Sequence, residues 1–218
     1  MIGVAFQLPI WFDLGAVFLL ALTGVWAAGR RGYDVVGAFI MAFVTGVGGG
    51  LLRDAVFLQE IPLVMQDVRY LWAVIAAVLV GALTHRLADR FEQGISYVDA
   101  TATGAYGVYG ANKALLAGLA PEAALLVGVC NAVGGGLIRD VLVREEPVLL
   151  KPGTLFAVAA LVGCLGFVLL SYQYGIDTQS AAWIAILMTL LIRILAVRFN
   201  WTTHAIGRRH RRKNGEDG

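Results

Sequence analysis

The sequence predicts an all-α integral membrane protein with seven transmembrane helices. Hydrophobic residues make up 59% of the 218 positions, charged residues only 15%, and the mean hydropathy is +0.75. Apolar runs such as residues 14–28, 71–83 and 155–170 contain no charged side chain, whereas arginines gather between and after such runs. This segregation is typical of helical membrane proteins and excludes a soluble globular domain.

A membrane-spanning helix needs about 20 mostly apolar residues, and seven segments of the chain meet that requirement. They cover residues 10–29, 34–57, 69–87, 97–117, 121–143, 153–172 and 180–198. The fourth segment is the least apolar, because tyrosines, threonines, Asn112 and Lys113 interrupt it. We expect a helix of that composition to line a polar cavity or to be buried against other protein.

An internal repeat relates the two halves of the chain at a constant offset of 86 residues. The matching pairs are Asp13 and Asp99, Gly24 and Gly110, Val47 and Val133, glycines 48–50 and 134–136, Arg53 and Arg139, Asp54 and Asp140, and Glu60 and Glu146. Each copy holds three predicted spans, so the second copy must enter the membrane from the opposite side. We therefore predict two inverted three-helix repeats (1–87 and 97–172), a seventh helix (180–198) and a basic cytoplasmic tail (199–218).

The basic residues predict that the N-terminus lies outside and the C-terminus in the cytoplasm. With that orientation, the cytoplasmic segments hold Arg30, Arg31, Arg86, Arg90, Arg144, Lys151, Arg198 and the basic cluster at 208–213. The opposite side holds mainly Arg69 as a basic residue. This asymmetry fits the rule that loops rich in lysine and arginine stay in the cytoplasm. We interpret the tail as a solvated topology signal, with binding to anionic lipid head groups as the alternative. We expect neither a cleavable signal peptide nor a nucleic-acid partner.

Two glycine-rich motifs lie in the second and fifth predicted spans. The sequence reads Gly-Gly-Gly-Leu-Leu-Arg-Asp at residues 48–54 and Gly-Gly-Gly-Leu-Ile-Arg-Asp at residues 134–140. Each glycine disfavours a helix by roughly 1 kcal/mol relative to alanine, so we interpret the motifs as functional helix breaks that free carbonyl oxygens near the bilayer centre. The alternative is that the glycines allow close helix packing. A nucleotide-binding loop is excluded, because no β-α-β pattern surrounds the motif and it has no Walker lysine.

The charged residues at membrane depth have two interpretations each. The Arg-Asp pairs either mark helix ends or line the two vestibules of a pore. Lys113 either extends towards the interface or projects into the pathway as an electrostatic gate. Asp13 and Asp99 are interpreted as helix N-terminal acids, with a pore role as the alternative. The candidate pathway residues are Thr45, Gly48, Gly49, Gly50, Arg53, Asp54, Lys113, Asn131, Gly134, Gly135, Gly136, Arg139 and Asp140.

The sequence offers no chemistry of another kind. His85, His204 and His210 are scattered and have no metal-ligand spacing, so we expect no metal site and no cofactor. No nucleophile stands in an arrangement with a base, and we expect no enzymatic activity. Cys130 and Cys164 lie in apolar segments and are interpreted as small buried hydrophobic residues.

The doubled glycine-Arg-Asp motif within seven spans resembles the prokaryotic branch of the trimeric intracellular cation channels, over essentially the whole chain up to the tail. Sequences of this branch are also labelled as a glycine-transporter domain family. The resemblance implies a homotrimer in the bacterial inner membrane, with a pore through each protomer lined mainly by the second and fifth helices. It also implies permeation of monovalent cations, chiefly potassium. Animal members bind phosphoinositides at a Lys-Glu-Val motif, which this chain lacks at the corresponding positions.

Three functions are therefore open at this point. The first is a potassium-permeable channel, in which freed carbonyls beside Thr45 and Asn131 replace part of the ion's hydration shell. The second is a secondary transporter of a small solute such as an amino acid, since inverted repeats with broken helices are equally typical of carriers. The third is a membrane scaffold that uses its glycines only for packing.

Overall fold

The computed structural model describes residues 6, 8–84, 88–150, 155–199 and 201 of the chain. These residues form helices and connecting segments, and no β-strand occurs among them. The first half contains α1 (Ile10–Arg30), α2 (Val35–Leu51), the π-helical η1 (Leu52–Leu58), the short α3 (Leu63–Gln66) and α4 (Val68–Thr84). The second half contains α5 (Ala88–Leu116), α6 (Pro121–Leu142), α7 (Phe156–Val168), the π-helical η3 (Leu169–Gln173) and α8 (Thr178–Arg198). The prediction of an all-α fold is confirmed.

The helices follow the predicted apolar segments closely, with one difference. Within the part of the chain that the structure describes, five helical stretches are long and apolar enough to cross a membrane, and a shorter apolar helix covers residues 68–84. The difference is α5, which begins at Ala88 rather than near residue 97. Hydropathy cannot detect its first turns, because a helix needs backbone hydrogen bonds but not apolar side chains.

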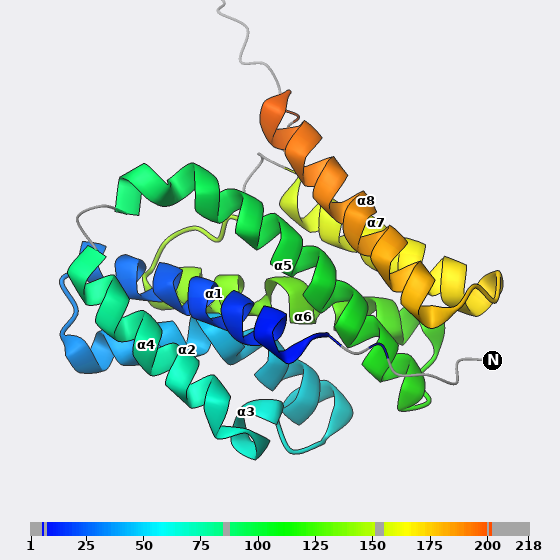
Figure 1. Cartoon of the computed structure of the whole chain (residues 1–218), viewed down its shortest axis with the longest axis horizontal. Coiled ribbons are helices and arrows are strands. Elements are labelled where there is room, and N and C mark those ends of the chain that lie inside the picture. The colour runs from blue at the N-terminus through cyan, green and yellow to red at the C-terminus, as the bar shows by residue number, and fades with distance from the viewer. Residues whose placement is uncertain (1–5, 7, 85–87, 151–154, 200, 202–218) are drawn as a thin grey trace, which may run out of the picture.

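The helices form two groups that meet along α2 and α6. In the first group, α1 packs on α2 and α4 around a core that includes Val17, Val25 and Val74. In the second group, α5 packs on α6, α7 and α8 around a core that includes Val108 and Phe167. Figure 1 shows α7 and α8 side by side, separated from α1 and α4 by α5. The contact between α2 and α6 therefore joins the two halves of the chain.

The predicted helix breaks at residues 48–50 and 134–136 are wrong. The α-helix continues through the first set of glycines to Leu51, and α6 continues through the second set to Leu142. The carbonyl oxygens of Gly48 and Gly49 are not free, because the backbone N–H of Leu52 donates to them. The chain departs from α-helical geometry only after the first set, where η1 begins.

The glycines instead allow α2 and α6 to cross with their backbones in contact. A Cβ atom on Gly49 would overlap the carbonyl oxygen of Asn131, and a Cβ atom on Gly135 would overlap that of Thr45. A Cβ atom on Gly48 would lie 3.3 Å from the Cα atom of Gly135. Close packing, the alternative that the sequence left open, explains the glycines at the centre of both motifs.

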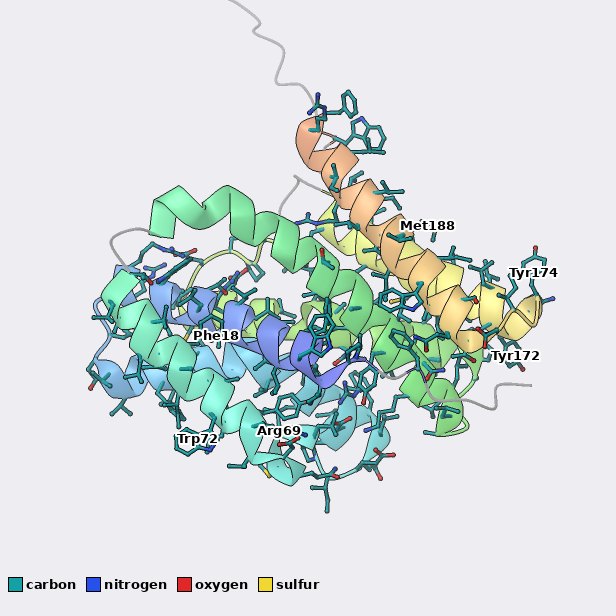
Figure 2. All side chains as sticks on the ribbon, viewed as in Figure 1. Phe18, Arg69, Trp72, Tyr172, Tyr174 and Met188 are labelled. Carbon is teal, nitrogen blue, oxygen red and sulfur yellow. The ribbon has the colours of Figure 1, made fainter. Side chains whose placement is uncertain are left out.

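The outer surface of the helix bundle carries many large apolar and aromatic side chains. Trp72 on α4 is 63% exposed, and Tyr172 and Tyr174, beyond α7, are 55% and 74% exposed. Figure 2 shows Tyr172 and Tyr174 projecting from the end of the helix pair α7–α8, and Trp72 on the outer side of α4. Such a surface suits contact with lipid, and tyrosine and tryptophan are typical of the boundary between lipid and water. The chain is an integral membrane protein.

Asp177 caps the N-terminus of α8, and its removal is expected to destabilise that helix. The backbone N–H of Ser180 donates to the Asp177 carboxylate at 3.0 Å, which lowers the pKa of Asp177. A lowered pKa means that the ionised cap stabilises the fold above the pKa of the unfolded chain, and that this contribution is lost as the pH falls through the folded pKa. We expect Asp177→Ala to lower the melting temperature of the detergent-solubilised protein slightly at pH 7 and less at pH 3. An equal loss at both pH values would contradict a role for the charged cap.

Candidate functional site

A cavity of about 310 Å³ lies between the two halves of the bundle, and α1, α2 and α6 supply most of its lining. Ten of the predicted pathway residues line it: Thr45, Gly49, Gly50, Arg53, Asp54, Asn131, Gly135, Gly136, Arg139 and Asp140. Gly48 and Gly134 lie instead in the contact between α2 and α6. The structure thus brings most of the two sequence motifs to one cavity.

Lys113 lines a second cavity of about 550 Å³, next to the first. Asp13, Leu63, Tyr70 and Tyr109 belong to the lining of both cavities. Phe6, Leu8 and Ile10, at and before the start of α1, also line the second cavity. Two adjoining cavities with a shared boundary therefore extend through this part of the molecule.

Arg53 and Asp54 form a buried ion pair at the boundary between α2–η1 and α6. Their side chains are 4% and 0% exposed, and the distance from Arg53 Nε to Asp54 Oδ1 is 2.6 Å. A second bond joins Arg53 Nη2 to Asp54 Oδ2 at 2.7 Å. Arg53 also donates to Asn131 Oδ1 at 3.3 Å, and its guanidinium carbon lies 4.8 Å from the centre of the Tyr109 ring. This bidentate geometry, with an aromatic face beside it, is the arrangement that makes arginine tolerable in a membrane protein's interior.

Asp54 holds a second cation and a backbone group. The Lys113 ammonium lies 2.8 Å from Asp54 Oδ1 and 2.7 Å from Glu60 Oε2. The backbone N–H of Leu63 donates to Asp54 Oδ2 at 3.2 Å. Lys113 therefore bridges a fully buried carboxylate and a half-exposed one, and it connects α5 with η1 and the segment that follows it.

Arg139 and Asp140 form the corresponding pair in the second half of the chain, and both line the first cavity. Arg139 Nη2 lies 2.7 Å from Asp140 Oδ1, and Arg139 Nη1 donates to Thr23 Oγ1 at 3.1 Å. The backbone N–H of Val148 donates to Asp140 Oδ2 at 3.0 Å. Asp140 is 5% exposed, so this carboxylate is also buried with an arginine and a backbone donor.

The two ion pairs follow one plan, with one difference. Each aspartate accepts from the preceding arginine and from a backbone N–H eight or nine positions further on. Arg53 meets Tyr109 and Arg139 meets Thr23, and these partners are themselves related by the offset of 86 residues. The difference is Lys113, because its equivalent in the first half is Ala27. Among the described residues, the carboxylate of Asp54 therefore pairs with an additional cation, whereas that of Asp140 pairs with Arg139 alone.

Sequence reasoning did not name several polar residues of the lining as candidates. Thr23 and Tyr70 were not singled out, and Tyr106 and Tyr109 were noted only as polar residues of a span expected to line a cavity, since hydropathy does not show which way a hydroxyl points. Arg193 on α8 lines the first cavity, is 5% exposed, and lies with its guanidinium carbon 4.6 Å from the centre of the Phe156 ring. A signal for Arg193 was present, because a single arginine inside an apolar span is a functional candidate by default.

The remaining candidates fall in several places. Asp13 lines both cavities, whereas the side chain of Asp99 lies outside the described residues. His85, His204 and His210 also lie outside them. Within the described residues, no group of three or more His, Cys, Asp or Glu side chains is placed to hold a metal ion. In that same part of the chain, Cys130 and Cys164 are free cysteines.

Comparison with known proteins places this site in a family. A family model described as Glycine transporter matches residues 10–86 and again residues 96–172. The chain belongs to the glycine transporter family. The two matches stand at the offset of 86 residues that relates the two glycine-Arg-Asp motifs.

Relatives of this family cover most of the chain. A UPF0126 membrane protein of Deinococcus radiodurans is 36% identical over 183 residues, 83% of this chain and 84% of its own length. The UPF0126 inner membrane protein YadS of Escherichia coli K12 is 31% identical over 196 residues, 89% of this chain and 94% of its own length.

Solved structures with this fold are cation channels. A TRIC cation channel studied for its conductance has a TM-score of 0.83 and 26% identity, covering 91% of this chain and 97% of its own. The TRIC trimeric intracellular cation channel orthologue from Rhodobacter sphaeroides has a TM-score of 0.79 and 27% identity, covering 88% and 98%. The resemblance noted from the glycine-Arg-Asp motifs is confirmed.

Proposed function

We propose that this chain is a cation channel, with a separate pathway through the two cavities of each protomer. The observation that supports this most directly is the cavity lined mainly by α1, α2 and α6, which holds two Arg-Asp ion pairs inside an apolar bundle. Burying charge in a membrane protein is costly, so charged side chains at membrane depth pair with one another or face a water-filled cavity, and they mark the pathways of ions and substrates. The similarity to solved TRIC cation channels points to the same function.

The proposed arrangement in the membrane is two inverted three-helix repeats followed by α8, seven crossings in all. The two matches to one family model and the repeated bonding plan of the Arg-Asp pairs support it. With an external N-terminus and a cytoplasmic C-terminus, most arginines between the spans lie on the cytoplasmic side, as the positive-inside rule requires. The inner membrane is the proposed location, as in YadS, with lipid as the surrounding partner and a homotrimer as the assembly, as in the R. sphaeroides orthologue.

Potassium is the proposed ion, and polar side chains with water are its proposed ligands. The intact helices at both glycine motifs argue against carbonyl oxygens as ligands there, since these carbonyls keep their helical hydrogen bonds. Asn131 is tied to Arg53 and, through its Nδ2 atom at 2.6 Å, to the carbonyl oxygen of Tyr106. Lys113 is the proposed electrostatic gate, because release of its ammonium from Asp54 and Glu60 would change the charge along the pathway.

A transporter of a small solute is the second candidate, favoured by the description of the matching family as Glycine transporter. A carrier and a channel can share this fold, since both need a polar cavity between two repeats. They differ in kinetics: a carrier shows saturable uptake and exchange of one solute, whereas a channel shows discrete unitary currents.

The experiment that tests the proposal is planar-bilayer recording of the purified protein, with potassium efflux from proteoliposomes beside it. We expect unitary currents whose reversal potential follows the potassium gradient and efflux that exceeds that of protein-free liposomes. Counterflow of labelled glycine in the same proteoliposomes, without unitary currents, would overturn the channel and support the carrier.

A further inference from the structure

We propose that Asp13 forms a binding site for a monovalent cation at the boundary between the two cavities. The proposal deepens the proposed function, since it names the residue that would favour cations along the pathway. It starts from the shared lining. Of the four described residues that line both cavities, Asp13 alone is charged, so an ion moving from one cavity to the other passes its carboxylate.

Asp13 differs from the other carboxylates of these cavities in its partners. Asp54, Asp140 and Glu60 each lie within ion-pair distance of an arginine or lysine. Among the described residues, no basic side chain forms an ion pair with Asp13. A half-buried carboxylate without a basic partner attracts a mobile cation strongly, because its charge is not compensated and is only partly screened by water.

Two tyrosines hold Asp13 in place without neutralising it. The Tyr70 hydroxyl donates to Asp13 Oδ2, and Tyr70 is 6% exposed. The Tyr106 hydroxyl donates to the backbone carbonyl oxygen of Asp13 at 3.2 Å. The first bond orients the carboxylate and the second holds the backbone that carries it, and neither supplies positive charge, so Asp13 is held in place for an ion as a preorganised binding site requires.

The composition of the site favours a partly hydrated monovalent cation. Calcium and magnesium prefer several carboxylate or carbonyl ligands at once, and every other carboxylate of the two linings for which the structure gives a contact is already paired. A single carboxylate beside neutral hydroxyls supplies one negative charge, which matches the charge of potassium or sodium. Asp13 also lies in the first turn of α1, where an acid stabilises the helix N-terminus. That role does not explain why its side chain lines both cavities.

Binding is tested first, independently of conduction. We expect KCl to raise the melting temperature of the detergent-solubilised protein above its value in N-methyl-D-glucamine chloride of equal ionic strength, because a bound cation stabilises the fold. Asp13→Asn should lose that difference, whereas Tyr70→Phe, which keeps the charge, should retain it. The matched control is Glu122→Gln, because Glu122 is an acid in the first turn of α6 that lines neither cavity.

Selectivity is then tested in bilayers. In a KCl gradient, Asp13→Asn should shift the reversal potential towards that of chloride and lower the unitary conductance in dilute KCl, on the order of threefold to tenfold. Asp13→Glu should restore both. Unchanged cation stabilisation and reversal potential in Asp13→Asn would overturn the site while leaving the channel intact. Stabilisation by potassium that depends on Asp13, without currents from the wild-type protein, would support the site and overturn the channel.

Discussion

Gly135→Ala is expected to destabilise the protein strongly, whereas Gly136→Ala, one position further along α6, is expected to be tolerated. A Cβ atom on Gly135 would overlap the carbonyl oxygen of Thr45, which is backbone and cannot turn aside. A Cβ atom on Gly136 would meet nothing within 4 Å. The first substitution therefore forces α2 and α6 apart, and the second only adds a residue that favours the helix.

The same contrast holds on α2. A Cβ atom on Gly49 would overlap the carbonyl oxygen of Asn131, whereas one on Gly50 would lie 3.8 Å from Arg53 Nη2, an ordinary contact. We expect Gly49→Ala and Gly135→Ala to lower the free energy of unfolding by about 1–3 kcal/mol or more, as overpacking does. We expect Gly50→Ala and Gly136→Ala to cost nothing or to gain up to roughly 1 kcal/mol from helix propensity.

The measurement is the melting temperature and the size-exclusion profile of the four variants in the same detergent. Potassium efflux from proteoliposomes should fall with the loss of folded protein in Gly49→Ala and Gly135→Ala. If all four variants melted alike, the helices would not be in backbone contact at the glycines. If Gly50→Ala and Gly136→Ala abolished efflux without loss of stability, these two glycines would be needed for the pathway itself.

The glycine motifs also show which features of the site could be predicted from the sequence and which could not. Their position in two apolar spans and their spacing of 86 residues predicted that both belong to one site, and the cavity lining agrees. The sequence could not show whether three glycines break a helix or bring two helices together, because both outcomes use the same residues. The choice depends on what faces Gly49 and Gly135, and those partners, Asn131 and Thr45, are distant in the chain.

The pairing of charges was beyond sequence reasoning for a similar reason. Neighbouring residues of a helix point in different directions and need not pair, so the sequence left open whether Arg53 binds Asp54. The structure pairs Arg53 with Asp54 in η1, and it pairs Arg139 with Asp140 in α6 in the same way. Lys113 lies on α5 and Asp13 on α1. Their partners are distant in the chain, so the sequence could not show that Lys113 binds Asp54 and Glu60 or that Asp13 accepts from Tyr70.

Asp54→Asn is expected to be the most destabilising single change among the charged residues of the site. The Asp54 side chain is 0% exposed and binds both Arg53 and Lys113. Removing its charge leaves two cations close together in a buried setting, and breaking a buried ion pair by removing one partner costs about 3–5 kcal/mol. Asp140→Asn should cost less, because Asp140 compensates one arginine, whose side chain is 23% exposed.

A second substitution tests whether Lys113 is the reason for the difference. In the Asp54→Asn background, Lys113→Met removes the cation that repels Arg53, and the carboxylate that it leaves behind, Glu60, has a side chain that is 47% exposed. We therefore expect the double variant to be more stable than Asp54→Asn alone, as determined by thermal unfolding of all four members of the mutant cycle. Additive losses, or equal effects of Asp54→Asn and Asp140→Asn, would show that Lys113 and Asp54 are not energetically coupled. Recovery would instead identify the Lys113–Asp54 contact as an interaction that holds α5 against η1, and whose opening changes the charge at one end of the pathway.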